Sequence, residues 1–144
     1  MEYSKLVNCI PELVSNNIEK TVEYYKNILG FRAVTHYDKS EKFAALYRDD
    51  VEIIIIQAKH GKVLPNNKRY GSGYDVYIDP KDVKGVDPLY EEFKNKGAKI
   101  VKTPSMADYG CYEFVIEDID GRLIGIGRVA DKVTFFGNQL LTKG

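Results

Sequence analysis

Apolar and polar positions alternate most clearly near the C-terminal end of the chain. Phe114 and Ile116 alternate with polar residues, and apolar positions resume at 123–126. Between these stretches, Asp-Ile-Asp-Gly at 118–121 favours a tight turn, because glycine adopts positive φ without a steric penalty. The pattern predicts a hairpin of two strands.

A helical spacing precedes each group of strands. Apolar residues recur from Ile18 to Leu29 at intervals of four, three and four, which places them on one helix face. Ser15-Asn16-Asn17 offers an N-cap, with Glu19 in the capping-box position relative to Asn16. Gly30 ends this predicted helix.

The order of elements occurs twice. We expect strands at 9–14, 31–37, 43–47 and 51–57 in the first unit, and at 73–79, 99–102 and on both sides of the 118–121 turn in the second. Asp87-Pro88 begins the second helix and Gly97 ends it. The sequence therefore predicts an α+β fold of two βαβββ modules in a single domain of residues 1–144. The expected parts are module one at 8–57, a polar linker at 58–72, module two at 73–128 and a C-terminal extension at 129–144.

Composition narrows the classes of protein. With 44% hydrophobic residues in 144, the chain can bury one shared core. Lys and Arg total 21 and Asp and Glu total 21, without a long run of one sign, so we expect no nucleic acid and no membrane partner. The longest apolar run, 51–56, is too short for a membrane span and no signal region is visible, so we expect a cytoplasmic protein. Cys9 and Cys111 lack the spacing of a zinc site and are expected to be reduced thiols.

Several motifs resemble one family. Tyr-Tyr-Lys-Asn-Ile-Leu-Gly-Phe at 24–31 and Asp-Ile-Asp-Gly at 118–121 resemble signatures of the glyoxalase, bleomycin-resistance and extradiol dioxygenase (vicinal oxygen chelate) superfamily. The stretches at 10–13, 43–46 and 109–114 are most similar to the bleomycin-resistance branch. The resemblance covers about residues 8–128. It implies a U-shaped mixed sheet around a cleft, and a homodimer.

The resemblance also bears on metal binding. Enzymes of this superfamily hold a divalent metal with one side chain from each of four strands. The positions that match here are Ile10, Ile54, Asp75 and Gly125. Isoleucine and glycine side chains have no donor atom, so a single carboxylate remains. We therefore expect no metal and no other cofactor, which argues against a metal-dependent glyoxalase, epimerase or dioxygenase.

Strand alternation indicates what lines the cleft instead. If Leu13 faces the helices, Glu12 faces the cleft. The fifth and seventh strands would add Asp75 and Glu113, which gives an acidic cleft with tyrosines beside it. Carboxylates attract cations, and each cation–π contact contributes about 0.5 to 2 kcal/mol. The candidate ligand-binding residues are Glu12, Asp75, Tyr77, Tyr109, Tyr112 and Glu113.

The sequence leaves three functions open. The first is a metal-free small-molecule binding protein of the bleomycin-resistance type, which sequesters a cationic or aromatic ligand in the acidic cleft. The second is a superfamily enzyme of lyase, isomerase or dioxygenase type, with Asp75 or Glu113 as general base on a small carbonyl substrate. The third is an interaction scaffold without a small ligand. The apolar segments 133–136 and 140–141 need cover, either on the body of the protein or at a subunit interface.

Overall fold

A computed structural model describes residues 2–137. The first module contains β1 (Glu12–Ser15), α1 (Ile18–Asn27), β2 (Arg32–His36), β3 (Phe43–Arg48) and β4 (Val51–Gln57). The segment between the modules includes the short helix α2 (Asn66–Tyr70). The second module and the helix after it contain β5 (Val76–Ile78), a 3₁₀ turn (Val83–Gly85), α3 (Val86–Asn95), β6 (Lys99–Met106), β7 (Cys111–Glu117), β8 (Leu123–Val129) and α4 (Lys132–Phe136).

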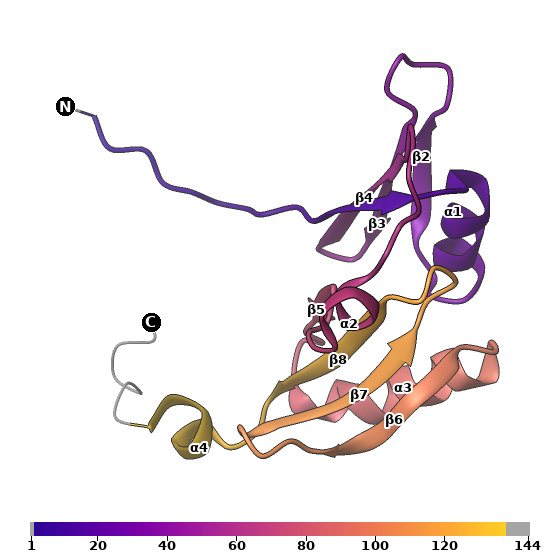
Figure 1. Cartoon of the computed structure of the whole chain (residues 1–144). Coiled ribbons are helices and arrows are strands. Elements are labelled where there is room, and N and C mark those ends of the chain that lie inside the picture. The colour runs from indigo at the N-terminus through magenta and orange to yellow at the C-terminus, as the bar shows by residue number, and fades with distance from the viewer. Residues whose placement is uncertain (1, 138–144) are drawn as a thin grey trace.

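Each module builds a four-stranded mixed sheet. The strand orders are β1-β4-β3-β2 and β5-β8-β7-β6, and in both sheets the first strand is parallel to its neighbour while the other pairs are antiparallel. The two sheets lie one above the other in Figure 1. The α+β class and the duplicated βαβββ order predicted from the sequence are confirmed.

The helices cover one face of each sheet and join a common core. Helix α1 contacts β2, β3 and β4, and α3 contacts β6, β7 and β8. Tyr25 of α1, Ile55 of β4 and Phe114 of β7 belong to one cluster of buried apolar side chains that spans both modules. Each fully buried side chain of this size contributes about 1.5–3 kcal/mol to folding. The opposite face of each sheet is not covered by α1 or α3.

Some element boundaries differ from the prediction. Strand β1 begins at Glu12 rather than at residue 9, because only 12–15 pair with β4. The N-cap of α1 is Asn17, whose side chain accepts from the Lys20 N–H, whereas the Asn16 amide donates to the Gly61 carbonyl. The 3₁₀ turn before α3 is capped by Asp82, and Asp87 lies in the first turn of α3.

Strand β6 is longer than predicted. It continues past Thr103-Pro104 to Met106, although proline cannot donate to a sheet. The pairing with β7 shifts register between Ile100 and Lys102 and again between Lys102 and Ser105. Such irregularities take Pro104 out of the regular ladder, so the strand does not have to end there.

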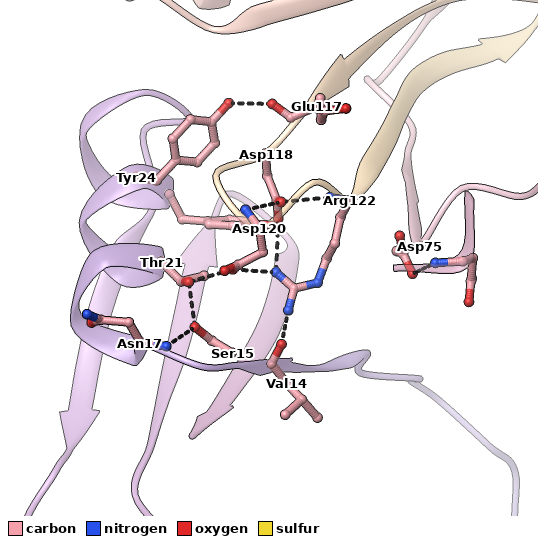
Figure 2. A network of polar contacts seen from close by, with 12 residues as sticks. Val14, Ser15, Asn17, Thr21, Tyr24, Asp75, Glu117, Asp118, Asp120 and Arg122 are labelled. Atoms are coloured by element: carbon pink, nitrogen blue, oxygen red, sulfur yellow. Dashed lines mark hydrogen bonds and ion pairs between the residues drawn. The ribbon is translucent and has the colours of Figure 1, made fainter. Parts of the chain in front are cut away.

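A buried polar network connects the modules (Figure 2). The Arg122 side chain, 3% exposed, lies 3.1 Å from the Asp118 carboxylate and 2.9 Å from that of Asp120, and it donates to the carbonyl of Val14 in module one. Tyr25 of α1 donates to Asp118 at 2.7 Å. The hairpin between β7 and β8 is thereby fixed against β1 and α1.

Candidate functional site: an aromatic cleft beside Glu113

A buried carboxylate lies at the centre of the second sheet. The Glu113 side chain is 0% exposed and accepts hydrogen bonds from three tyrosine hydroxyls. The donor–acceptor distances are 2.8 Å from Tyr74, 3.0 Å from Tyr77 and 2.6 Å from Tyr109. The Lys102 ammonium lies 3.7 Å away. This charge is therefore satisfied within the protein, as a buried carboxylate requires.

Two glycines of β8 make room for this arrangement. Gly125 is the register partner of Tyr77, and Gly127 is that of Glu113. A Cβ at Gly125 would lie 2.7 Å from the Tyr77 ring and 2.8 Å from the Tyr74 ring, and one at Gly127 would lie 2.6 Å from the Tyr77 hydroxyl. Any side chain there would displace the tyrosines, so the sequence Gly-Ile-Gly in β8 positions the rings.

The three hydroxyls are held in their protonated form. Burial, followed by the hydrogen bond to Glu113, raises the pKa of Tyr77 and Tyr109 far above the ordinary value, and the same causes raise the pKa of Tyr74. The tyrosines therefore donate to Glu113 at any physiological pH. The hydrogen bonds to Glu113 hold the rings in place and use the hydroxyl protons, so these hydroxyls have no proton left to donate to a ligand.

A cleft of about 870 Å³ opens beside these rings. Helix α4 also lines it, and the start of this helix is held in place because the N–H groups of Ala130 and Asp131 both donate to the Gly110 carbonyl at 2.9 Å. Two phenylalanines of α4 line the same cleft as the tyrosines. The lining residues are Tyr74, Tyr77, Asp79, Tyr109, Cys111, Arg128, Val129, Lys132, Phe135 and Phe136.

Three of the predicted ligand-binding residues meet at this site. Tyr77 and Tyr109 line the cleft, and Glu113 lies behind them. Tyr112 is on the other side of β7, where its hydroxyl donates to Asp87 of α3 at 2.7 Å. Neighbouring residues of a strand point to opposite faces, so Tyr112 cannot share a face with Glu113.

The three predicted carboxylates do not share one concavity. Glu12 lies in a separate hollow of about 340 Å³ on module one, with Phe43, Ile54 and Ile56. Asp75 accepts from the Asn66 N–H at the start of α2, and Figure 2 shows it apart from the Arg122 network. The expectation of a single acidic cleft is wrong for this chain, because Glu12 lies in the hollow of the other sheet, Asp75 is not among the residues that line the cleft, and Glu113 is buried behind the tyrosines. Ligand binding by the six residues stays a prediction.

Part of the cleft wall was not predicted from the sequence. Arg128 of module two was not assigned to the site, and neither were Lys132, Phe135 and Phe136, because the role of the 129–144 extension was open. Residues 140–141 lie outside the described part of the chain. Alternate glycines in β8, at 125 and 127, were the signal that something bulky lies against this strand.

The matched metal positions do not suit a metal ion. Gly125 is covered by the rings of Tyr74 and Tyr77, and Ile54 lies in the other hollow. Within residues 2–137 no three His, Cys, Asp or Glu side chains are grouped as they would be around a metal. Because the tyrosine rings cover Gly125, no metal-coordinating side chain can project into the cleft from this position of β8.

Fold and site define a duplicated βαβββ protein with an open aromatic cleft. Residues 7–126 match the family model of the Glyoxalase/Bleomycin resistance protein/Dioxygenase superfamily, so the chain belongs to this superfamily. No curated protein sequence gives a significant match. Among the described residues, no helix has the length and apolar character needed to cross a membrane.

Solved structures share the fold at low sequence identity. A glyoxalase/bleomycin resistance protein/dioxygenase domain from Frankia sp. is 15% identical, with a TM-score of 0.70, over 89% of this chain and 95% of its own. A superfamily protein from Nocardioides is 16% identical, with a TM-score of 0.65, over 90% and 87%. A protein from the mobile metagenome of V. Pseudocholerae is 25% identical, with a TM-score of 0.60, over 88% of this chain and 95% of its own.

Proposed function

We propose that this chain is a metal-free small-molecule binding protein of the bleomycin-resistance type, which sequesters an aromatic ligand in the cleft beside Glu113. One observation carries the proposal: five ring side chains line a cleft of about 870 Å³, those of Tyr74, Tyr77, Tyr109, Phe135 and Phe136. Pockets of roughly 300–1,000 Å³ hold most drug-sized ligands.

The fixed rings favour binding. Each well-placed pair of aromatic rings contributes about 0.5–1.5 kcal/mol beyond the area that it buries. A ligand usually has to immobilise the side chains that it contacts, which weakens binding. Here the hydroxyls of Tyr77 and Tyr109 are already held by Glu113, so the rings are ordered before the ligand arrives.

The general-base alternative receives less support from this geometry. Both oxygens of Glu113 accept from tyrosine hydroxyls, and the carboxylate does not line the cleft. A substrate in the cleft would meet hydroxyls that are already donating, not a free base. Asp75 is also absent from the cleft lining. We therefore favour sequestration over proton abstraction.

The homodimer expected from the resemblance remains a proposal. The segment before β1 carries exposed apolar side chains, with Leu6 99% and Val7 92% exposed. A second copy of the chain would give such residues a surface to cover. Light scattering coupled to size-exclusion chromatography would decide: a mass near 33 kDa, twice the 16.4 kDa of the chain, is expected, and a mass of one chain would overturn it.

Calorimetric titration tests the binding function. The chelator-treated protein is titrated with metal-free bleomycin and with 2-naphthamide, a neutral planar probe. We expect saturable binding of at least one of them, with about one ligand per chain, and a loss of affinity in Phe135→Ala. Tyr77→Phe is the matched control, because it removes a hydroxyl but keeps the ring. Absence of saturable heat with both ligands contradicts the proposal.

A further inference from the structure

The charged groups at the cleft do not make it acidic. Its lining contains three charged side chains, those of Asp79, Arg128 and Lys132. The Asp79 carboxylate has a partner, since a guanidinium nitrogen of Arg128 lies 3.8 Å from it. The same nitrogen donates to the Pro80 carbonyl at 3.0 Å. Lys132 forms no ion pair with any other residue in the part of the chain that is described. Among residues 2–137, one positive charge of the cleft lining thus has no ion-pair partner.

The buried carboxylate of Glu113 does not reverse this balance. It has no exposed surface, and three hydroxyl donors surround it. The Lys102 ammonium, 3.7 Å away, supplies a compensating positive charge. A ligand in the cleft meets the tyrosine rings rather than the carboxylate. Of the charged side chains that line the cleft, Asp79 and Arg128 are paired with each other, and Lys132 has no ion-pair partner among residues 2–137.

We propose that the ligand of this cleft is an aromatic carboxylate: a planar ring system that lies between the tyrosines and phenylalanines, with its single negative charge beside Lys132. The inference rests on the proposed function and names the chemical class of its ligand. A monoanion suits one ammonium group that has no ion-pair partner in the described part of the chain. A cationic ligand, which the sequence analysis left open, would be repelled by Lys132 and would have to displace Arg128 from Asp79.

The location of Lys132 supports this assignment. It is the first residue of α4, in the same short helix as Phe135 and Phe136. The N-terminal end of that helix is fixed by the hydrogen bonds of Ala130 and Asp131 to Gly110. One element therefore presents both ring surface and positive charge to the same cleft. The Lys132 side chain is itself exposed, so its replacement should not affect folding.

Three probes with one ring system test the inference. Binding of 2-naphthoate, 2-naphthamide and 2-naphthylmethylammonium is measured by calorimetry at pH 7 and low salt. We expect 2-naphthoate to bind about fivefold more tightly than the amide, and the ammonium probe to bind most weakly. Added salt should reduce the difference, because screening weakens exposed ion pairs.

The variants separate charge from ring surface. Lys132→Met should bring 2-naphthoate to within about twofold of the amide. Lys62→Met is the matched control: it removes the same charge from an exposed residue of the linker that does not line the cleft, and the preference for the anion should persist. Equal binding of the three probes, or tighter binding of the ammonium, overturns this inference and leaves the proposed function standing. No binding of any of the three probes overturns this inference, and it overturns the proposed function as well when bleomycin also fails to bind.

Discussion

Two buried carboxylates of module two are compensated in different ways. Asp118 is paired with the guanidinium of Arg122 and also accepts a hydrogen bond from Tyr25, so a full positive charge compensates its negative charge. The charge of Glu113 is stabilised mainly by hydrogen bonds from three neutral tyrosine hydroxyls. The first arrangement joins the two modules. The second holds aromatic rings that line a cleft.

The difference has a physical reason. A guanidinium offers five donors in one plane and connects several backbone and side-chain acceptors, which suits a joint between two modules. Three tyrosines satisfy the same charge but also bring ring surface, which suits a binding wall. Removing a charge at the Arg122 site should therefore cost the most free energy of unfolding. At the Glu113 site, a substitution that displaces the tyrosine rings should have the larger effect.

The largest effect is expected from Arg122→Met. It leaves Asp118 buried without its countercharge, which costs about 3–5 kcal/mol in the free energy of unfolding. Urea denaturation followed by circular dichroism measures this loss. Arg32→Met is the control, because Arg32 is exposed, and it should stay within about 0.5 kcal/mol of the wild type. A loss for Arg122→Met no larger than that of the control would mean that the network does not hold the modules together.

Gly125→Ala should have the next largest effect, at the other site. Its Cβ would lie 2.7 Å from the Tyr77 ring, and such overpacking costs about 1–3 kcal/mol. The displaced rings should also weaken the binding of an aromatic probe. Arg122→Met, in contrast, should leave the affinity of the folded molecules for this probe unchanged. Denaturation and probe titration of the same sample test both effects. Unchanged affinity would show that the rings are not the binding surface.

Tyr77→Phe separates the hydroxyl from the ring. The loss of one hydrogen bond to Glu113 should lower the free energy of unfolding by about 1 kcal/mol. Affinity for 2-naphthamide should change less than about twofold, because the ring remains. A large loss of affinity with little loss of stability would instead assign ligand contact to the hydroxyl.

The smallest effect concerns a second contact between the modules. Arg48 forms two hydrogen bonds with Glu92 of α3, at 2.8 and 2.9 Å, and they lower the pKa of Glu92. A lowered pKa in the folded state stabilises the protein above the ordinary carboxyl range, and the gain is lost as the pH falls through the lowered pKa. Glu92→Gln should cost about 0.5 kcal/mol at pH 7, because the pair is partly exposed, and nothing at low pH. Stability curves of both proteins against pH check this, and a difference that grows toward low pH would refute the assignment.

Local pattern and turn chemistry predicted the modules well. The positions of β4 and of the 118–121 turn agree with the structure, and Gly121 has the expected positive φ of 87°. The formation of β4 and of this turn depends mainly on residues that are close in the sequence. The start of β1 and the end of β6 were wrong, because pairing with a distant strand decides them.

The site was predicted only in part for a similar reason. Alternation along β5 and β7 placed Tyr77 and Glu113 on one face, as found. Which carboxylates come together depends on how two sheets are arranged, and no local pattern contains that information, so Glu12 was assigned to the wrong hollow. The cleft wall from α4 depends on a contact with Gly110 across the fold. Tertiary contacts of this kind leave no periodic signal.

The most direct test of the central claim is to locate an aromatic ligand among the tyrosines. Protein labelled in its tyrosine rings is titrated with 2-naphthamide and followed by NMR. Ring currents from a stacked ligand should shift the signals of Tyr74, Tyr77 and Tyr109 saturably, while those of Tyr47 and Tyr70, which do not line the cleft, stay in place. Saturable shifts confined to tyrosines outside the cleft, or no shifts at all, would contradict the account.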